Sequence, residues 1–275
     1  MNYTELTVST PDTAQAEIAM AALSDFPFDS FEEEDGVLKA YIREDDWRTV
    51  RPEVEACLAD GGWAHTYATI PATNWNAVWE ANFEPITVDG RCAIRAPFHV
   101  PYPDYEYEIV IMPKMSFGTG HHATTGLMVS ALLTMDVAGR EGLDMGSGTG
   151  ILAILAAKRG AAHIDAIDID EWAYENGSEN VAANGVADRV RPMQGDASLL
   201  GTDRYDFVLA NINRNILLAD MGRYAGALRQ GGTLVMSGIL EADIPAIEAE
   251  ASRLGLRPEA RDTRNGWASV RCRKY

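Results

Sequence analysis

The sequence predicts an α/β protein in which a large, doubly wound parallel sheet follows a smaller α+β domain. Two observations carry this prediction. Residues 1–71 contain six short elements in the order βαββαβ. From about Glu141 onward, short apolar strands alternate with helices. Repeated βα units imply parallel strands, because each crossover helix returns the chain to the same end of the sheet. A chain of 275 residues has room for both domains.

The first domain is expected over residues 1–71. Tyr3–Ser9 alternates polar and apolar residues, as a half-buried strand does, and a helix is expected from Pro11 to Leu23. Asp35-Gly36 predicts a tight hairpin. The remaining elements are strands at Phe26–Glu34, Val37–Ile42 and Ala64–Ile70, and a helix at Asp45–Ala59. This order predicts a ferredoxin-like sandwich.

A boundary follows at Pro71, and residues 72–84 are expected to form a linker helix. Trp75, Trp79 and Phe83 recur every four residues, which places three aromatic side chains on one helix face. We interpret this face as a packing surface. Several prolines then interrupt a region of short strands and loops.

The second domain, residues 85–275, carries the alternating pattern. Strands are expected at Leu143-Asp144, Ile164–Ile167, Val190–Gln194, Tyr205–Ala210 and Thr233–Gly238, helices at Ile151–Arg159, Glu171–Asn184, Ile216–Leu228 and Asp243–Leu254, and two final strands within Leu256–Arg273. The pattern predicts a Rossmann-like sheet with helices on both faces. Ligands bind such sheets at the carboxyl ends of the strands.

The net charge is strongly negative, with 23 basic and 41 acidic residues giving −18. Binding to nucleic-acid phosphates needs clustered Lys and Arg, so no direct nucleic-acid binding is expected. Residues 1–71 hold 15 acidic and 4 basic side chains, so they carry most of the excess negative charge. Such a surface either keeps the protein soluble or attracts a basic protein partner.

Three scattered cysteines, Cys57, Cys92 and Cys272, form no CxxC pair, which favours reduced thiols over a disulfide framework or a zinc site. The N-terminus lacks the segments of a secretory signal peptide, and no run reaches 18 apolar residues. We therefore expect an unprocessed, soluble cytoplasmic protein that does not enter a membrane. We also expect a monomer.

The strongest motif places Asp144, Gly146, Gly148 and Gly150 between a strand and a helix. Its glycines let the backbone turn tightly and approach a ligand closely. The dinucleotide fingerprint GxGxxG would need glycine at Ile151, so an NAD dehydrogenase is disfavoured. The pattern D-x-G-x-G-x-G is typical of Rossmann-like methyltransferases that bind S-adenosylmethionine. A purely structural turn is the alternative.

Acidic residues follow the next two strands. Asp168 lies eighteen residues beyond the glycine motif, where an acid can accept hydrogen bonds from both ribose hydroxyls of a nucleoside. Ile169 is assigned to the same cofactor site, and Asp170 is interpreted as a helix N-cap. Asp196 and Ala197 lie where an adenine edge would be recognised, with a plain turn as the alternative.

The fourth strand ends in Ala210-Asn211-Ile212-Asn213. A carboxamide at this end of the sheet can accept a hydrogen bond from an incoming amine, so Asn211 is the candidate catalytic residue and a candidate cofactor contact. The alternative is an Asn that caps the following helix. Amino methyltransferases commonly carry Asn-Pro-Pro-Tyr or Asp-Pro-Pro-Tyr here. The missing prolines disfavour a nucleobase or glutamine substrate.

Upstream, the run from Ser116 to Thr125 combines two glycines, an aromatic residue and paired hydroxyls before a helix. This composition indicates a loop that closes over a ligand. His121 and His122 suggest a metal site, but adjacent side chains diverge and no nearby residues complete a ligand set, so no metal is expected.

These motifs together resemble those of the bacterial ribosomal protein L11 methyltransferases, the PrmA family. The resemblance spans nearly the full length of the chain. It rests on Trp75–Trp79 with Asn82-Phe83, Phe117–Thr125, Asp144–Gly150, Asp168–Asp170 and Ala210–Ile212. The run that begins at Phe117 is the most specific of them.

The resemblance implies a ferredoxin-like substrate-recognition domain, a linker helix and a class I methyltransferase domain. It implies S-adenosylmethionine contacts at Thr125, Gly146, Asp168 and Asn211, with Phe117 and Thr119 in a loop over the cofactor. It also implies repeated methyl transfer, up to trimethylation, to the N-terminal α-amino group and lysine ε-amino groups of ribosomal protein L11, free or on the ribosome.

Two other hypotheses remain. A methyltransferase acting on a small molecule would not need residues 1–71, so residues 72–275 alone would stay fully active; another protein amine is a further possible target. A non-catalytic binding module would retain the cofactor only as a structural ligand.

Overall fold

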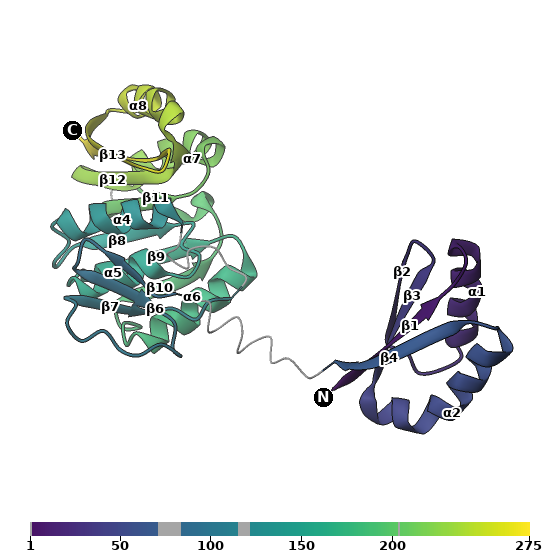
Figure 1. The fold of residues 1–275 in the computed structure, drawn as a ribbon. Helices are drawn as coiled ribbons and strands as arrows, with labels where there is room; N and C mark the ends of the chain where they lie inside the picture. The colour runs from purple at the N-terminus through teal and green to yellow at the C-terminus, as the bar shows by residue number, and fades with distance from the viewer. Residues whose placement is uncertain (1, 71–83, 115–121, 203) are drawn as a thin grey trace. The chain divides into compact units, whose positions relative to one another are not determined.

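The computed structural model describes residues 2–70, 84–114, 122–202 and 204–275. The chain divides into two compact units, Met1–Asn82 and Phe83–Tyr275 (Figure 1). The expected aromatic stripe at Trp75, Trp79 and Phe83 lies outside the described residues, as do Phe117 and Thr119. No helix in the described ranges is long and apolar enough to span a membrane.

The first unit has the ferredoxin-like element order. It runs β1 (Tyr3–Ser9), α1 (Thr13–Leu23), β2 (Ser30–Glu34), β3 (Val37–Arg43), α2 (Glu44–Asp60) and β4 (Ala64–Ile70). Its antiparallel sheet has the order β2-β3-β1-β4. Alternate residues of β1 and β3 are buried, so one sheet face packs against the two helices.

Local turns define this unit as the sequence predicted, with one difference. Asp35 and Gly36 have φ of 50° and 79°, so the hairpin is confirmed. β2 begins at Ser30 and not at Phe26, because Phe26 and Phe28 pack against the core from a turn that follows α1.

The second unit begins with a small sheet of β5 (Ile86–Val88), β6 (Cys92–Arg95) and β7 (Tyr107–Val110). It then runs α4 (Ala123–Thr134), β8 (Glu141–Met145), α5 (Ile151–Lys158), β9 (His163–Asp168), α6 (Glu171–Ala183), β10 (Val190–Gln194), η1 (Ala197–Leu199), β11 (Tyr205–Asn211), α7 (Arg214–Ala227), β12 (Leu228–Leu240), η2 (Glu241–Asp243), α8 (Ile244–Arg253), β13 (Leu256–Arg264) and β14 (Trp267–Lys274). β12 begins earlier than the expected Thr233, because Leu228 already pairs with Tyr205.

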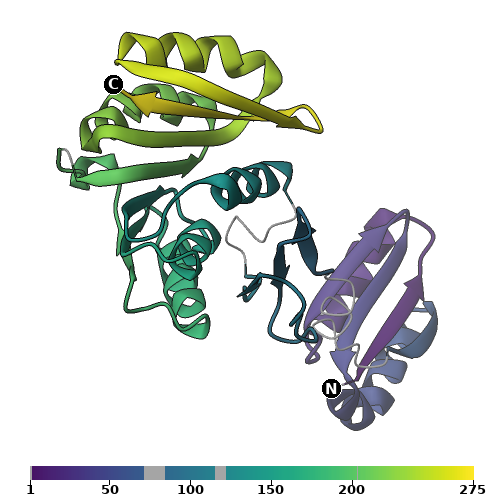
Figure 2. The same cartoon turned by 90° about the vertical axis from the view of Figure 1, so that its left-hand side faces the viewer.

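The main sheet has the order β10-β9-β8-β11-β12-β14-β13. The strands from β10 to β12 are parallel, and β13 and β14 form an antiparallel hairpin at the other edge (Figure 2). The strand order reverses between β8 and β11. Doubly wound sheets bind ligands at such a switch point, outside the carboxyl ends of the strands.

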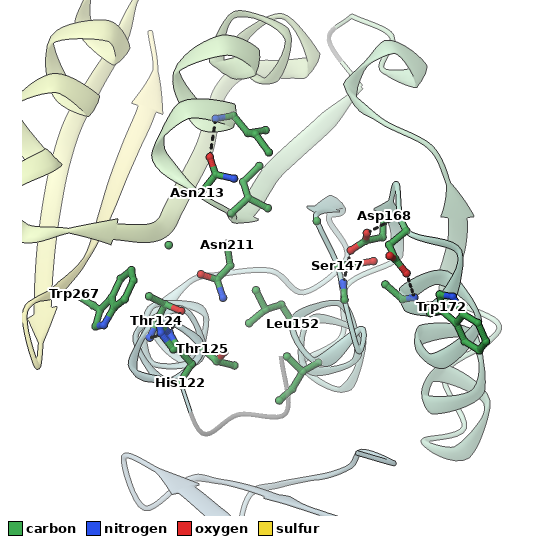
Figure 3. A pocket seen from close by; sticks show the side chains of 18 of the residues that line it. His122, Thr124, Thr125, Ser147, Leu152, Asp168, Trp172, Asn211, Asn213 and Trp267 are labelled. Carbon is green, nitrogen blue, oxygen red and sulfur yellow. Dashed lines mark hydrogen bonds between the residues drawn. The ribbon is translucent and has the colours of Figure 1, made fainter. Parts of the chain in front are cut away.

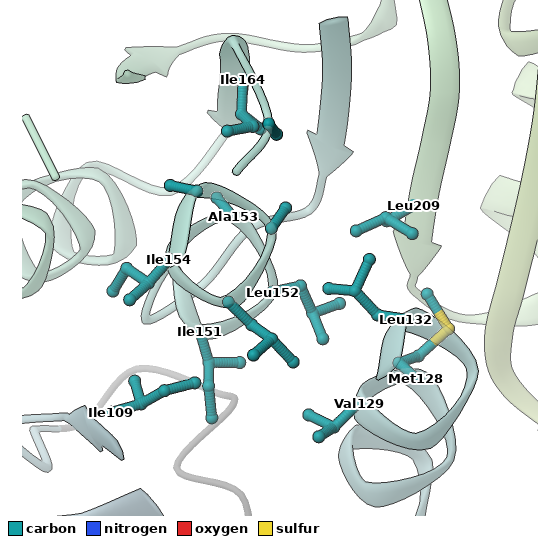
Figure 4. Packing of buried hydrophobic residues seen from close by; sticks show 14 of the residues in the cluster. Ile109, Met128, Val129, Leu132, Ile151, Leu152, Ala153, Ile154, Ile164 and Leu209 are labelled. Carbon is teal, nitrogen blue, oxygen red and sulfur yellow. The ribbon is translucent and has the colours of Figure 1, made fainter. Parts of the chain in front are cut away.

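Two apolar cores cover the two faces of this sheet. Helices α4, α5 and α6 contribute to one core, and α7 and α8 to the other. α5 is buried along almost its whole length: Ile151, Leu152 and Ile154 pack among side chains of α4, β7 and the main sheet (Figure 4). A helix enclosed on all sides fixes the position of the glycine loop that precedes it.

A buried carboxylate, that of Asp165, connects neighbouring strands of the main sheet. Asp165 of β9 is 1% exposed and accepts hydrogen bonds from Tyr205 Oη at 2.7 Å and Arg191 Nε at 2.8 Å, with Arg204 at 2.8 Å and His163 at 2.9 Å. Burial alone would raise the pKa of Asp165. The hydrogen bonds from Tyr205, Arg191 and His163 and the charge of Arg204 outweigh burial, and the pKa is lowered.

We therefore expect Tyr205→Phe to lower the free energy of unfolding by about 1–2 kcal/mol, since a buried carboxylate oxygen loses a donor. Tyr224→Phe is the matched control: Tyr224 is equally buried, but its hydroxyl has no hydrogen-bond partner within the described ranges. Removing the Tyr224 hydroxyl should leave the free energy of unfolding unchanged or raise it. Urea denaturation measures both variants, and equal losses would contradict the account.

Candidate active site

A cavity of about 880 Å³ lies at the carboxyl ends of the parallel strands (Figure 3). Its wall combines the start of α4, the loop between β8 and α5, and the ends of β9, β11 and β12, with a contribution from β14. Five residues predicted from the sequence line it: Thr125, Gly146, Gly148, Asp168 and Asn211. Parallel pairing of the strands brings these distant positions together.

The glycine loop forms the middle of the wall. Gly146 has a φ of 70°, and a Cβ at this position would overlap Cγ2 of Ile212. The loop therefore packs against the turn that follows β11, and its backbone is exposed to the cavity. Gly150 does not line the cavity, since it precedes α5 and packs against Gly177 of α6.

Asp168 joins the loop to the end of β9. Its Oδ2 accepts a hydrogen bond from the backbone N–H of Gly148 at 2.8 Å, and its Oδ1 accepts one from Asp170 N–H at 3.0 Å. Each carboxylate oxygen keeps a second lone pair, so ribose hydroxyls can still donate to it. The Asp170 side chain accepts from Ala173 N–H at 3.0 Å, which confirms its prediction as the N-cap of α6.

Two buried oxygens in the wall have no hydrogen-bond partner within the described ranges. Asn213, and not Asn211, caps α7, because its side chain accepts from Asn215 N–H and Ile216 N–H at 3.1 Å each. Asn211 is thus available to the cavity. Its Oδ1 and the Oγ1 of Thr125 are buried with no hydrogen-bond partner among the residues that the structure describes. An unsatisfied buried oxygen costs about 1–3 kcal/mol, so both favour a ligand that brings its own donors.

The far end of the cavity is aromatic. The ring of His122 meets that of Trp267 edge-on, with centroids 4.6 Å apart, and His122 Nδ1 lies 2.7 Å from Thr124 Oγ1 (Figure 3). Trp267 is not among the residues predicted from the sequence, because only the antiparallel placement of β14 beside β12 brings it to the wall. In the described part of the chain, no three His, Cys, Asp or Glu side chains form a group that could hold a metal ion.

The cavity fits S-adenosylmethionine by its shape and chemistry. Asp168 lies toward one end and Trp267 toward the other, with Asn211 and Ser147 of the glycine loop between them (Figure 3). A volume near 880 Å³ lies in the range of cofactor sites and leaves space for a target group. The one lining lysine, Lys114, is paired with Glu179 at 2.5 Å, so the carboxylates of Asp168 and Asp170 favour a cationic ligand.

Besides Gly150, four predicted cofactor residues lie away from the wall. Asp144 is 1% exposed and accepts from Ala153 N–H at 3.1 Å, so it holds the start of α5 against β8. Asp196 accepts from Ser198 N–H at 2.7 Å, and Ala197 is buried in the core. Ile169 is 71% exposed. The lining of the cavity includes none of these side chains, and a cofactor contact for each stays a prediction.

Asp144 makes stability depend on pH. Burial raises the pKa of Asp144 to about 7, opposed by the hydrogen bond from Ala153 and assisted by the charge of Asp168. Its unfolded pKa is about 3.9, so between these values the folded protein keeps a proton that the unfolded chain has lost. The free energy of unfolding therefore falls as pH rises through this window.

We expect the free energy of unfolding of Asp144→Asn, relative to the parent, to be higher at pH 8 than at pH 4.5 by at least about 1 kcal/mol. Urea denaturation at the two pH values measures this change. Asp136→Asn is the control, since Arg140 lowers the pKa of Asp136 and no such gain is expected. A stability difference for Asp144→Asn that is equal at both pH values would refute the prediction.

The sequence matches the family described as Ribosomal protein L11 methyltransferase (PrmA) over residues 4–275. A Ribosomal protein L11 methyltransferase from Porphyromonas gingivalis is 45% identical, covering 93% of this chain and 89% of that protein. One from Bacteroides fragilis is 43% identical, covering 98% and 99%. The crystal structure of a ribosomal protein L11 methylase from Lactobacillus delbrueckii subsp. bulgaricus gives a TM-score of 0.63 at 27% identity, over 70% of this chain and 100% of that one. This chain therefore belongs to the ribosomal protein L11 methyltransferase (PrmA) family.

Proposed function

We propose that this protein transfers methyl groups from S-adenosylmethionine to the lysine ε-amino and N-terminal α-amino groups of ribosomal protein L11. The observation that carries the proposal is the family match over residues 4–275, joined to a cavity in which Asn211 and Thr125 present buried oxygens to a ligand. An amine and a cofactor rich in donors would satisfy both oxygens.

Each part of the wall has a distinct role in this proposal. When bound, S-adenosylmethionine supplies a methyl group activated by a sulfonium centre. Asp168 would hold the ribose through its free lone pairs, and the backbone at Gly146 and Gly148 would hold the amino-acid portion. Asn211 Oδ1 accepts a hydrogen bond from the target amine and so directs its lone pair toward the methyl group. Positioning of this kind can supply most of the acceleration.

The target amine must be neutral to act as the nucleophile. Removing the proton from a lysine with a pKa of about 10.4 costs roughly 4.6 kcal/mol at pH 7, whereas an α-amine with a pKa of about 7.7–8.0 costs only about 1 kcal/mol. Apolar side chains of Leu152, Ile216 and Trp267 line the cavity. Desolvation by them favours the neutral amine, so the site works without a dedicated general base.

The first unit is proposed to recognise the substrate. Residues 1–71 carry a net charge of −11, and Glu32 and Glu34 of β2 are exposed. An acidic surface attracts a basic ribosomal protein and accelerates its association. We infer that the enzyme acts in the cytoplasm as a monomer, on L11 either free or on the ribosome.

Incubation with labelled S-adenosylmethionine and purified ribosomal proteins tests the function directly. We expect label on L11 with the full-length chain. Asn211→Ala should reduce turnover by about 100-fold, with a cofactor Kd changed less than threefold, because Asn211 orients the amine. Asn211→Asp, which keeps an oxygen acceptor, should retain more activity. Absence of label on L11 would overturn the function, and near-normal turnover by Asn211→Ala would overturn the role of this residue.

Charge-guided docking should depend on salt. Raising ionic strength from 50 to 300 mM screens exposed charges, so the KM for L11 should rise several-fold while the cofactor Kd stays constant. Glu32→Gln combined with Glu34→Gln should flatten this dependence. Asp104→Asn with Asp188→Asn, two exposed acids of the second unit, should not. A KM insensitive to salt would contradict the docking role.

A further inference from the structure

Gly238 of β12 lies directly beside Ile212, the residue that follows Asn211 at the end of β11. It follows Ser237, which pairs with Asn211 in the parallel register. Gly238 has a φ of 85°, and a Cβ here would overlap the carbonyl oxygen of Ile212 and lie 2.7 Å from its carbonyl carbon and 3.0 Å from its nitrogen. These are backbone atoms, which cannot move aside as a flexible side chain does. Only glycine fits without displacing Ile212.

A β-bulge creates this close approach. Between β12 and β14, Met236 pairs with Val270, and Ile239 pairs with Ala268. Ser237 and Gly238 therefore stand opposite a single residue, as in bulges that have glycine at a positive φ. Ser237 is fully buried, and its Oγ donates a hydrogen bond to the carbonyl oxygen of Ala268 at 2.8 Å. Trp267, the neighbour of Ala268, lines the cavity.

Ile212 is held from three sides. Gly238 contacts the backbone of Ile212, and Gly146 leaves space for its Cγ2. The next residue, Asn213, is held in place because its side chain caps α7. Asn211 immediately precedes this constrained residue, so the direction of its carboxamide depends on where the Ile212 backbone lies. The bulge thus links the part of the cavity wall that holds Asn211 to the part that holds Trp267.

We propose that Gly238 is a positioning residue for methyl transfer: the bulge at Ser237-Gly238 sets the Ile212 backbone and thereby holds the Asn211 carboxamide toward the target amine. This inference rests on the proposed function. It concerns the geometry of the transfer step. The Asp168–Gly148 hydrogen bond at the proposed ribose site does not involve β12, so that end of the cavity should keep its geometry when Gly238 is changed.

Gly238→Ala tests the proposal. A methyl group at this position must displace the Ile212 backbone, and misplacement of a catalytic group by about 1 Å can cost about 100-fold in rate. We expect kcat toward L11 to fall between about 10-fold and 100-fold, with a Kd for S-adenosylhomocysteine changed less than threefold.

Gly255→Ala is the matched control. Gly255 also has a positive φ, of 77°, but a Cβ there meets nothing within 4 Å. Both variants carry the strain of an alanine at positive φ, and Gly238→Ala carries the overlap with the Ile212 backbone in addition, so it should lose more stability. Only Gly238→Ala should lose kcat in the folded protein. A folded Gly238→Ala protein with the kcat of the parent would overturn the proposal.

Two further measurements separate the positioning claim from folding and from the function itself. Ser237→Ala keeps the glycine but releases the bulge from Ala268, and should lower kcat at least about threefold with the fold retained. NMR of the Asn211 carboxamide, assigned with Asn211→Asp, should show shifted signals in Gly238→Ala and parent-like signals in Gly255→Ala. If the parent chain does not methylate L11, the proposed function fails, and unchanged carboxamide signals in Gly238→Ala would separately refute the positioning role.

Discussion

The site depends on the parallel register of β9, β8, β11 and β12. Asp144 pairs with Ala166, Ala210 with Met145, and Asn211 with Ser237, so these strands end at one edge. Gly146, Asp168, Asn211 and Gly238 are far apart in the sequence, and this register brings them to one cavity. A slip of one residue in the pairing of β9 or β11 would turn the side chain of Asp168 or Asn211 to the opposite face of the sheet.

Packing on both sheet faces keeps this edge rigid. α5 is buried among α4, β7 and the sheet, and the Asp165 network links β9 to the start of β11. The strand ends thus carry glycines and partly unsatisfied polar groups while the rest of the domain supplies the stability. Asp144 is an example: its burial raises the pKa of its carboxyl group, and its hydrogen bond from Ala153 N–H holds the start of α5 next to the glycine loop.

Local patterns predicted most of the fold and part of the site. Strand and helix periodicity, the Asp35-Gly36 turn, and the motif residues Gly146, Asp168 and Asn211 need only short stretches of sequence. Trp267 and Gly238 could not be identified in this way, because the placement of β14 beside β12 and a bulge in their pairing bring these two residues to the cavity wall. The supporting role of Asp144 likewise could not be predicted from local sequence, because it follows from the burial of its side chain in the folded domain.

We expect one cavity to orient both the cofactor and the target amine around Asn211. A crystal structure of the full chain with S-adenosylhomocysteine would show whether it does. It should place the ribose hydroxyls within hydrogen-bond distance of Asp168, the amino-acid portion against Gly146 and Gly148, and the sulfur facing the space between Asn211 and Trp267. A ligand bound outside this cavity, or one whose sulfur faces away from Asn211, would contradict this expectation.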